Sequence, residues 1–355
     1  MNDPRASGPL PSPASGTPGA GTAGPGAAGA GAAGAGTARE RLLPAERGVV
    51  PGGLDAGGGA TPSFAIPPDA RAGLPATPAP LRIGGRTFAW GERTFVMGIV
   101  NVTPDSFSGD GLATPGARWV DAALSLAGRM IDEGADLLDV GGESSRPGHA
   151  AVLADEEARR VVPVVAALHA AHPAVPISVD TTKPSVAAAA LDAGAALVND
   201  IWGVADDDAL ARLAGERGIP IVLMHNRAEA RYTSLLSEVI ADLQRAVDRA
   251  VRAGVPWDAI VVDPGFGFGK APEHNLALLR HLGALRALGR PVLLGTSRKS
   301  TLGKILDLPP AERLEATLAT TALAAAAGVD IVRVHDVRPN VRAARMADAI
   351  VRPAR

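Results

Sequence analysis

Eight short apolar runs recur along most of the chain, and longer amphipathic stretches separate them. The runs are 96–102, 137–140, 177–179, 197–198, 219–224, 260–262, 292–294 and 331–334. Most are continuously apolar rather than alternating, which is typical of strands buried on both faces. The clearest helical stretch is 235–251, where apolar residues recur at helical spacing. The pattern predicts repeated β-α units and therefore a parallel sheet.

Eight such units predict a TIM (β/α)8 barrel, an α/β fold, over residues 81–355. This segment has a suitable length, because such barrels typically need about 250 residues. A doubly wound open sheet is the alternative, but no Gly-x-Gly-x-x-Gly turn follows the first run. The segment 81–94 contains the pair Gly84 and Gly85, and it predicts a short N-terminal hairpin at the bottom of the barrel.

Residues 1–80 differ sharply in composition from the rest. Tracts such as 19–36 consist almost entirely of glycine and alanine, with proline and threonine. Such a segment has little apolar surface to bury and much backbone entropy to lose, so we expect a disordered extension. No secretory signal is visible, and no apolar run reaches the roughly 18 residues of a membrane span. We therefore expect a cytoplasmic protein without membrane contact.

Charge and cysteine content exclude several classes of function. The formal net charge is -2, so nothing indicates general attraction to nucleic acid, and an anionic substrate needs local basic groups. The chain has no cysteine. Disulfides, thiolate metal sites and a cysteine nucleophile are therefore excluded.

Polar residues stand at or near the end of almost every apolar run. They are Asn101, Asp139, Asp180, Asn199, His225, Asp263, Ser297 and the pair Arg333 and His335. TIM barrels build their active sites from the C-terminal ends of the strands and the loops that follow. A single Asp or Asn there often only caps a helix. All of these strand ends together favour a site at the barrel mouth.

Strand alternation limits which of these side chains share a face. Arg333 and His335 are two residues apart and point the same way, whereas Asn199 and Asp200 point to opposite faces. The period alone does not decide which of Asn199 and Asp200 faces the lumen.

The polar residues fall into two chemical groups. Asp180, Asn199 and Asp263 suit a heterocycle with amide and amidine groups, because carboxylates bind paired N–H groups. A second group suits a phosphate or carboxylate: Arg146, Lys299, Arg333 and His335. The run 301–304 predicts a short helix directly after Lys299, whose N-terminus would add to an anion site.

Two glycine-rich loops follow strands, at 141–148 and 263–270. Glycines there permit left-handed turns and close approach of the backbone to a ligand. The second loop carries Phe266 and Phe268 in a chain with only 3% aromatic residues. These rings either stack on a planar ligand or plug the loop structurally.

These motifs, taken together, resemble the dihydropteroate synthase family over residues 82–351. The matching segments occur in order: 97–108 (MGIVNVTPDSFS), 139–148 (DVGGESSRPG), 177–181 (ISVDT), 198–201 (VNDI), 263–270 (DPGFGFGK), 297–300 (SRKS) and 333–336 (RVHD). The resemblance implies displacement of pyrophosphate from a dihydropterin methyl group by the amine of 4-aminobenzoate. The leaving pyrophosphate would be neutralised by Mg²⁺ with Arg333 and His335.

The resemblance also implies residue roles, in four sets. The pterin set is Asp180, Asn199, Asp263 and Lys299, and the Mg²⁺ ligand is Asn101. The anion set is Ser145, Arg146, Arg333 and His335. The aminobenzoate pocket is Phe107, Pro147, Phe268 and Ser300. Asp180, Lys299, Arg333 and His335 would carry catalysis. The family further implies a homodimer and a sulfonamide target.

Three positions depart from the family pattern. Ser145 stands where threonine is usual, but the hydroxyl is kept. Asp110 lies one place away from the usual acidic position of the first loop, and Asn226 with Arg227 replaces a Gln-Gly pair.

Two other functions are alternatives on the same fold. A methyltetrahydrofolate:corrinoid methyltransferase would not need the anion set, and a catalytically silent module would not need to keep both anion and metal groups.

Overall fold

The computed structural model describes residues 77–103, 118–143, 151–203, 205 and 207–352. The extension expected over 1–80 lies almost wholly outside these residues, as do Phe107, Asp110, Ser145, Arg146 and Pro147.

All eight apolar runs form parallel strands. They are β3 (Phe95–Asn101), β4 (Leu137–Gly141), β5 (Ile177–Asp180), β6 (Leu197–Asp200), β7 (Ile221–Met224), β8 (Ile260–Asp263), β9 (Leu293–Leu294) and β10 (Ile331–Val334). Their order in the sheet is β8-β7-β6-β5-β4-β3-β10-β9. An isolated parallel bridge between Val262 and Val292 brings the two edges together. The strands therefore form a barrel, and the open-sheet alternative is wrong.

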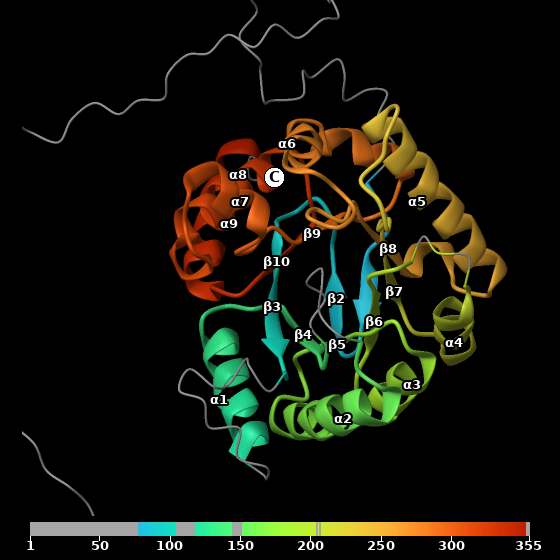
Figure 1. Cartoon of the computed structure of the whole chain (residues 1–355). Coiled ribbons are helices and arrows are strands. Elements are labelled where there is room, and N and C mark those ends of the chain that lie inside the picture. Colours follow the sequence, from blue (N-terminus) through green and yellow to red (C-terminus); the bar gives the residue numbers. More distant parts are fainter. Residues whose placement is uncertain (1–76, 104–117, 144–150, 204, 206, 353–355) are drawn as a thin grey trace, which may run out of the picture. The chain divides into compact units, whose positions relative to one another are not determined.

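Helices surround the ring of strands (Figure 1). They are α1 (Arg118–Asp132), α2 (Ala154–Ala171), α3 (Pro184–Asp192), α4 (Ala209–Arg217), α5 (Leu235–Arg252), α6 (Pro272–Arg280), α7 (Ser300–Leu306), α8 (Leu314–Ala326) and α9 (Val337–Val351). Short 3-10 turns lie at η2 (Trp257–Ala259), η3 (Leu282–Leu288) and η4 (Pro310–Glu312). The helix expected at 235–251 is confirmed. Among the described residues, no helix is long and apolar enough to cross a membrane.

The strands are continuously apolar because both of their faces are covered. Neighbouring residues such as Leu137 and Leu138 point to opposite faces, yet both are almost fully buried. One face packs inside the barrel and the other packs under the helices, so the pattern has no polar alternation.

The predicted hairpin consists of β1 (Leu81–Ile83) and β2 (Arg86–Phe88), which pair antiparallel. Gly84 adopts a positive φ of 56° in the turn, and a Cβ there would lie 3.3 Å from the Cβ of Ala196. Ala196 directly precedes β6, so the hairpin lies at the N-terminal ends of the strands. The expected place at the barrel bottom is confirmed, opposite the strand ends that carry the candidate site.

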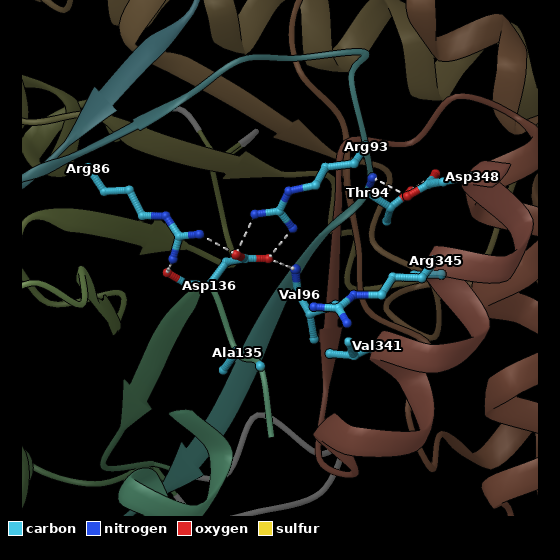
Figure 2. Close-up of a pocket in the computed structure, with 11 residues that line it drawn as sticks. Arg86, Arg93, Thr94, Val96, Ala135, Asp136, Val341, Arg345 and Asp348 are labelled. Carbon is cyan, nitrogen blue, oxygen red and sulfur yellow. Dashed lines mark hydrogen bonds and ion pairs between the residues drawn. The ribbon is translucent and has the colours of Figure 1, made fainter. Parts of the chain in front are cut away.

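A carboxylate ties the hairpin to the barrel (Figure 2). Asp136, just before β4, accepts hydrogen bonds from Arg86 Nη2 and Arg93 Nη2 at 2.6 Å each, and from the backbone N–H of Val96 at 2.9 Å. These groups line a cavity of about 260 Å³, together with Arg345 and Asp348 of α9. Asp136 thus joins the hairpin, the start of β3 and the start of β4.

Asp136→Asn should lower the free energy of unfolding by about 2–3 kcal/mol, because hydrogen bonds to charged groups contribute about 1.5–3 kcal/mol each and the arginines stay partly solvated. Asn is uncharged and accepts with one oxygen only. It therefore cannot replace both Oδ1, which accepts from Arg86 and Arg93, and Oδ2, which accepts from Arg93 and Val96. Urea unfolding measures the effect. Asp132→Asn, a helix-end acid outside this cluster, is the control. Equal stability of the Asp136 variant and the wild type would contradict this role.

Candidate functional site

Arg333 lies at the centre of the polar groups inside the barrel. Its Nε donates to Asp139 Oδ2 at 2.6 Å, and its Nη2 donates to Asp180 Oδ2 at 2.7 Å. One guanidinium from β10 therefore joins carboxylates from β4 and β5. The Arg333 side chain is 16% exposed, and Asp139 is fully buried. Such a bridge keeps a cation fixed in orientation inside a site with little water.

Asn199, and not Asp200, points into the lumen. The Asn199 amide donates to Asp139 Oδ2 at 3.1 Å. Asp200 instead accepts from the backbone N–H of Trp202 at 2.9 Å. Burial raises the pKa of Asp200 to about 6, and Arg249 of α5 is among the groups that oppose the rise. The structure thereby decides the alternative that strand alternation left open.

Asp139 is a site component that the sequence did not assign. It was visible only as one of many strand-end polar residues, yet it holds both Arg333 and Asn199. Asp139 lies level with Ile99 and Ser178 in the strand register, below the mouth. Its depth explains why it supports neighbouring side chains.

The barrel mouth lies one layer above Asp139, toward the C-terminal ends of the strands. Strand register aligns Asn101 with Gly141, Gly141 with Asp180, and Asp180 with Asn199. The predicted Mg²⁺ ligand and two of the predicted pterin residues are therefore neighbours at one level. On the far side, Met224 aligns with Asp263.

Burial raises the pKa of the Asp180 carboxyl to about 7, with Asp139 and Glu157 adding to the rise and Arg333 opposing it. Burial dominates because a carboxylate removed from water is disfavoured in its charged form, and nearby carboxylates repel a further negative charge. A heterocycle that brings N–H donors to Asp180 would favour its ionised form.

Asp263 and Lys299 form the opposite wall. Asp263 Oδ1 accepts from the backbone N–H of Gly265 at 2.7 Å, and burial raises its pKa against the opposing pull of Lys299. Lys299 donates to the carbonyl oxygen of Phe266. Burial lowers the pKa of Lys299 to about 8, while Asp263 opposes this. The Lys299 ammonium therefore titrates within reach of ordinary pH.

Phe266 and Phe268 have different roles. Phe266 is fully buried in the core, so the interpretation as a structural plug holds for this ring. Phe268 is partly exposed, and the Lys299 ammonium lies 4.3 Å from its ring centroid. Phe268 alone of the pair is available to a planar ligand.

Hydrogen bonds join the loop after β9 to the loop after β10. Ser297 Oγ accepts from the His335 backbone N–H at 3.1 Å and lies 3.0 Å from His335 Nδ1. Arg298 Nε donates to Asp336 at 3.0 Å. The predicted short helix is α7, which begins at Ser300 with Lys299 as its N-cap. Ser300 is exposed.

His225 does not face the mouth, although it directly follows β7. It is fully buried, with Nε2 3.1 Å from Asp242 of α5 and Nδ1 2.8 Å from the ammonium of Lys270. Sequence reasoning missed Lys270 and Asp242. The only available signal was the lysine that ends the glycine-rich run 263–270.

The described residues contain no group of three or more His, Asp or Glu residues that would hold a metal ion by themselves. Asn101 offers a single amide oxygen at the mouth. One hard oxygen ligand fits Mg²⁺, which usually takes one or two protein ligands and completes its shell with waters and substrate phosphates.

Comparisons with known proteins agree with this geometry. The sequence profile of the family described as "Pterin binding enzyme" matches residues 97–335. A dihydropteroate synthase of Bacillus subtilis is 51% identical over 73% of this chain and 90% of its own length. That of Clostridium beijerinckii is 46% identical over 77% of this chain and 100% of its own length.

Solved structures give the same result. A Clostridium difficile dihydropteroate synthase, crystallised in the presence of pteroic acid, superposes with a TM-score of 0.72 at 48% identity, over 75% of this chain and 99% of that one. The Xanthomonas albilineans enzyme with 4-aminobenzoic acid superposes with a TM-score of 0.73 at 42% identity, over 78% of this chain and 100% of that one.

Proposed function

Because this chain belongs to the dihydropteroate synthase family, we propose that it is a transferase that condenses 6-hydroxymethyl-7,8-dihydropterin pyrophosphate with 4-aminobenzoate. The products are 7,8-dihydropteroate and pyrophosphate, in folate biosynthesis. The observation that carries the proposal is one barrel mouth with two chemistries: carboxylates and an amide for the heterocycle, and cations for the leaving group. The Xanthomonas albilineans relative has been solved with 7,8-dihydropteroate, which supports it.

The pterin side consists of Asp180, Asn199, Asp263 and Lys299. Asp180 and Asp263 are acceptors on opposite walls of the mouth, so they suit N–H groups at two edges of a flat ring. Lys299 donates, and it neutralises part of the charge of Asp263. The position of these groups on strand ends fixes the ring before chemistry begins.

The leaving-group side consists of Arg333, His335 and the Mg²⁺ ligand Asn101, with Ser145 and Arg146 proposed from their motif. Bound Mg²⁺ would neutralise charge on the pyrophosphate oxygens. Arg333 is held by two carboxylates and keeps its charge, since those carboxylates raise its pKa further. It therefore meets the growing negative charge without reorganising.

The reaction breaks the bond between the pterin methylene carbon and the pyrophosphate oxygen, and that oxygen keeps the electron pair. The lone pair of the aminobenzoate nitrogen forms the new carbon–nitrogen bond, and the nitrogen then loses one proton to solvent. As the carbon–oxygen bond stretches, positive charge develops on the methylene. Asp180 and Asp263 would stabilise that charge, so no side-chain nucleophile is required.

The aminobenzoate side consists of Phe268 and Ser300, with Phe107 and Pro147 proposed from their motifs. The partly exposed ring of Phe268 lies next to Lys299, so it borders the pterin side. An aminobenzoate held beside the pterin in this way would have its amine next to the methylene carbon. A sulfonamide drug occupies the Yersinia pestis relative, and we propose that sulfonamides compete with 4-aminobenzoate here.

An assay with both substrates and Mg²⁺ tests the function. Formation of dihydropteroate with an equal amount of pyrophosphate is the expected result. Methyl transfer from methyltetrahydrofolate to a corrinoid, without pteroate formation, would identify the rival methyltransferase instead. Binding of the pterin substrate without either product would identify a silent module.

Removing Mg²⁺ with a chelator is expected to lower turnover by a factor of about 100 or more, because the metal contributes several kcal/mol of charge stabilisation. The unfolding temperature should stay unchanged, since a single protein ligand contributes little to the fold. Activity should return when Mg²⁺ is added back. Full turnover in the chelated enzyme would exclude the metal from the reaction.

We also propose a homodimer. Leu323 of α8 and Met346 and Ile350 of α9 are 38%, 64% and 69% exposed. Met346 and Ile350 are one helical turn apart, so they share a face. Apolar side chains grouped on two packed helices are a usual basis for subunit contact. Light scattering of the full chain measures the mass, and a monomer at all concentrations would reject this proposal.

A further inference from the structure

Lys270 belongs to the glycine-rich loop between β8 and α6, and its buried ammonium lies against His225. We propose that Lys270 is a positioning residue for pterin binding: its buried ammonium fixes the loop backbone at Gly265, whose N–H donates to the Asp263 carboxylate. The inference rests on the proposed function, since Asp263 is the pterin acceptor there. Lys270 itself touches no substrate in this proposal.

All three N–H groups of the Lys270 ammonium have acceptors. Nζ donates to the carbonyl oxygens of Gly265 at 3.1 Å and Phe268 at 3.0 Å. The third acceptor is His225 Nδ1 at 2.8 Å. Lys270 is only 9% exposed. Because a buried cation is costly unless every donor is satisfied, this arrangement indicates a specific role for the charge.

The contact with Lys270 fixes the tautomer of His225. An ammonium only donates, so Nδ1 must accept and Nε2 must carry the proton, which it donates to Asp242 Oδ2 at 3.1 Å. Burial lowers the pKa of His225 to about 4, and Lys270 contributes to this. Asp242 is held in turn by Arg227 Nη2 at 2.7 Å. Helix α5 is thus connected to the loop through His225.

The loop backbone lies directly on the residues that follow β7. Gly265 has a φ of 68°, and a Cβ there would lie 1.8 Å from the carbonyl oxygen of His225. Gly269 has a φ of 54°, and a Cβ there would lie 2.2 Å from the carbonyl oxygen of Arg227. Only glycine permits this approach, and it turns the loop carbonyl oxygens toward Lys270.

Three cations act on Asp263: Lys299, Lys270 and, from β10, Arg333. Lys299 from the start of α7 and Lys270 both lower the pKa of this buried carboxyl, against the larger effect of burial. Asp263, Lys299, Arg227 and Asp242 are the charged groups that act on Lys270. Burial lowers the pKa of Lys270 to about 7, whereas its three acceptors favour the protonated form. Loss of the Lys270 charge would therefore raise the pKa of Asp263 further.

The test compares Lys270→Met, which removes the charge, with Lys270→Arg, which keeps it. Lys270→Met should lower kcat/KM for the pterin substrate about tenfold to hundredfold, mainly through a higher KM. The acidic limb of its pH profile for kcat/KM should move to higher pH, because removal of a nearby positive charge raises the pKa of a carboxyl. Lys270→Arg should keep the wild-type acidic limb even if its KM rises. Lys304→Met removes an exposed lysine on α7 and should behave as wild type.

If the acidic limb of the pH profile of Lys270→Met does not move, the proposal is overturned, whatever the stability of this variant. If Lys270→Met does not fold, Lys270→Gln takes its place in the test. The acidic limb of the pH profile of Lys270→Gln must then move to higher pH. Calorimetric titration with the pterin substrate across pH separates this inference from the reaction. If the wild type binds pterin but forms no dihydropteroate, the proposed function fails, and the pH dependence of binding still judges Lys270.

Discussion

Arg333→Ala is expected to lower kcat/KM for the pterin substrate about a thousandfold, the loss typical of removing a transition-state charge donor. The guanidinium is the best-held cation of the mouth, since Asp139 and Asp180 both bind it. Its loss removes the group that we propose meets the leaving pyrophosphate. It also leaves two buried carboxylates without their shared partner, which costs about 3–5 kcal/mol of stability.

The stability loss in Arg333→Ala should depend on pH. Burial already raises the pKa of Asp180 above its unfolded value, to about 7, and the variant should raise it further. A carboxyl with a raised folded pKa favours folding below its unfolded pKa, and this contribution is lost as pH rises through the folded pKa. The variant should therefore be closest to wild type in acid and weakest above neutral pH.

Steady-state kinetics and urea unfolding at several pH values measure both effects. Arg342→Ala, an exposed arginine on α9, is the control and should match the wild type. Arg333→Lys keeps one positive charge but lacks the fork that binds two carboxylates, so an intermediate loss is expected. Wild-type kinetics in Arg333→Ala would remove this residue from the leaving-group side.

Lys299→Ala is expected to weaken binding of the pterin substrate about a hundredfold, because a hydrogen-bonded charge at a water-poor site contributes about 1.5–3 kcal/mol. The fold should remain intact. Lys299 is the N-cap residue of α7, but no side-chain cap bond depends on it. Titration calorimetry measures the binding, and Lys304→Ala on the same helix is the matched control. Unchanged affinity would exclude Lys299 from the pterin side.

The pH profile gives a second measure of Lys299. Burial lowers its pKa to about 8, so wild-type kcat/KM should fall as pH rises through that value and the ammonium loses its proton. Lys299→Arg keeps its charge at high pH, so its alkaline limb should disappear. An alkaline limb that persists in Lys299→Arg would assign the titration to another group.

The barrel could be predicted because its strands are covered on both faces. That arrangement makes each strand a continuous apolar run and each helix an amphipathic one, and both patterns depend on local sequence alone. Even β9, with only two residues, was marked by the run at 292–294. The polar strand ends were predictable for the same reason, since they interrupt these runs at one edge of the sheet.

Orientation and depth could not be predicted. Asn199 and Asp200 are adjacent, and the strand period fits either of them toward the lumen. His225 directly follows its strand, yet it is buried against α5 and Lys270. Phe266 and Phe268 are two residues apart in one loop, yet only Phe266 is fully buried. Each outcome depends on packing between elements distant in sequence, and local pattern contains no record of it.

The barrel closes between β8 and β9, and few backbone hydrogen bonds join these two strands. β9 contributes two residues, and Val262 donates to the carbonyl oxygen of Pro291 at 2.9 Å to bring the edges together. Asp263 stands on one side of this closure, and Lys299 follows the strand on the other. A bound pterin that contacts both residues would act as a cross-link between the edges. Pterin binding would then also make local opening of the barrel less favourable between β8 and β9, where the backbone hydrogen bonds are fewest.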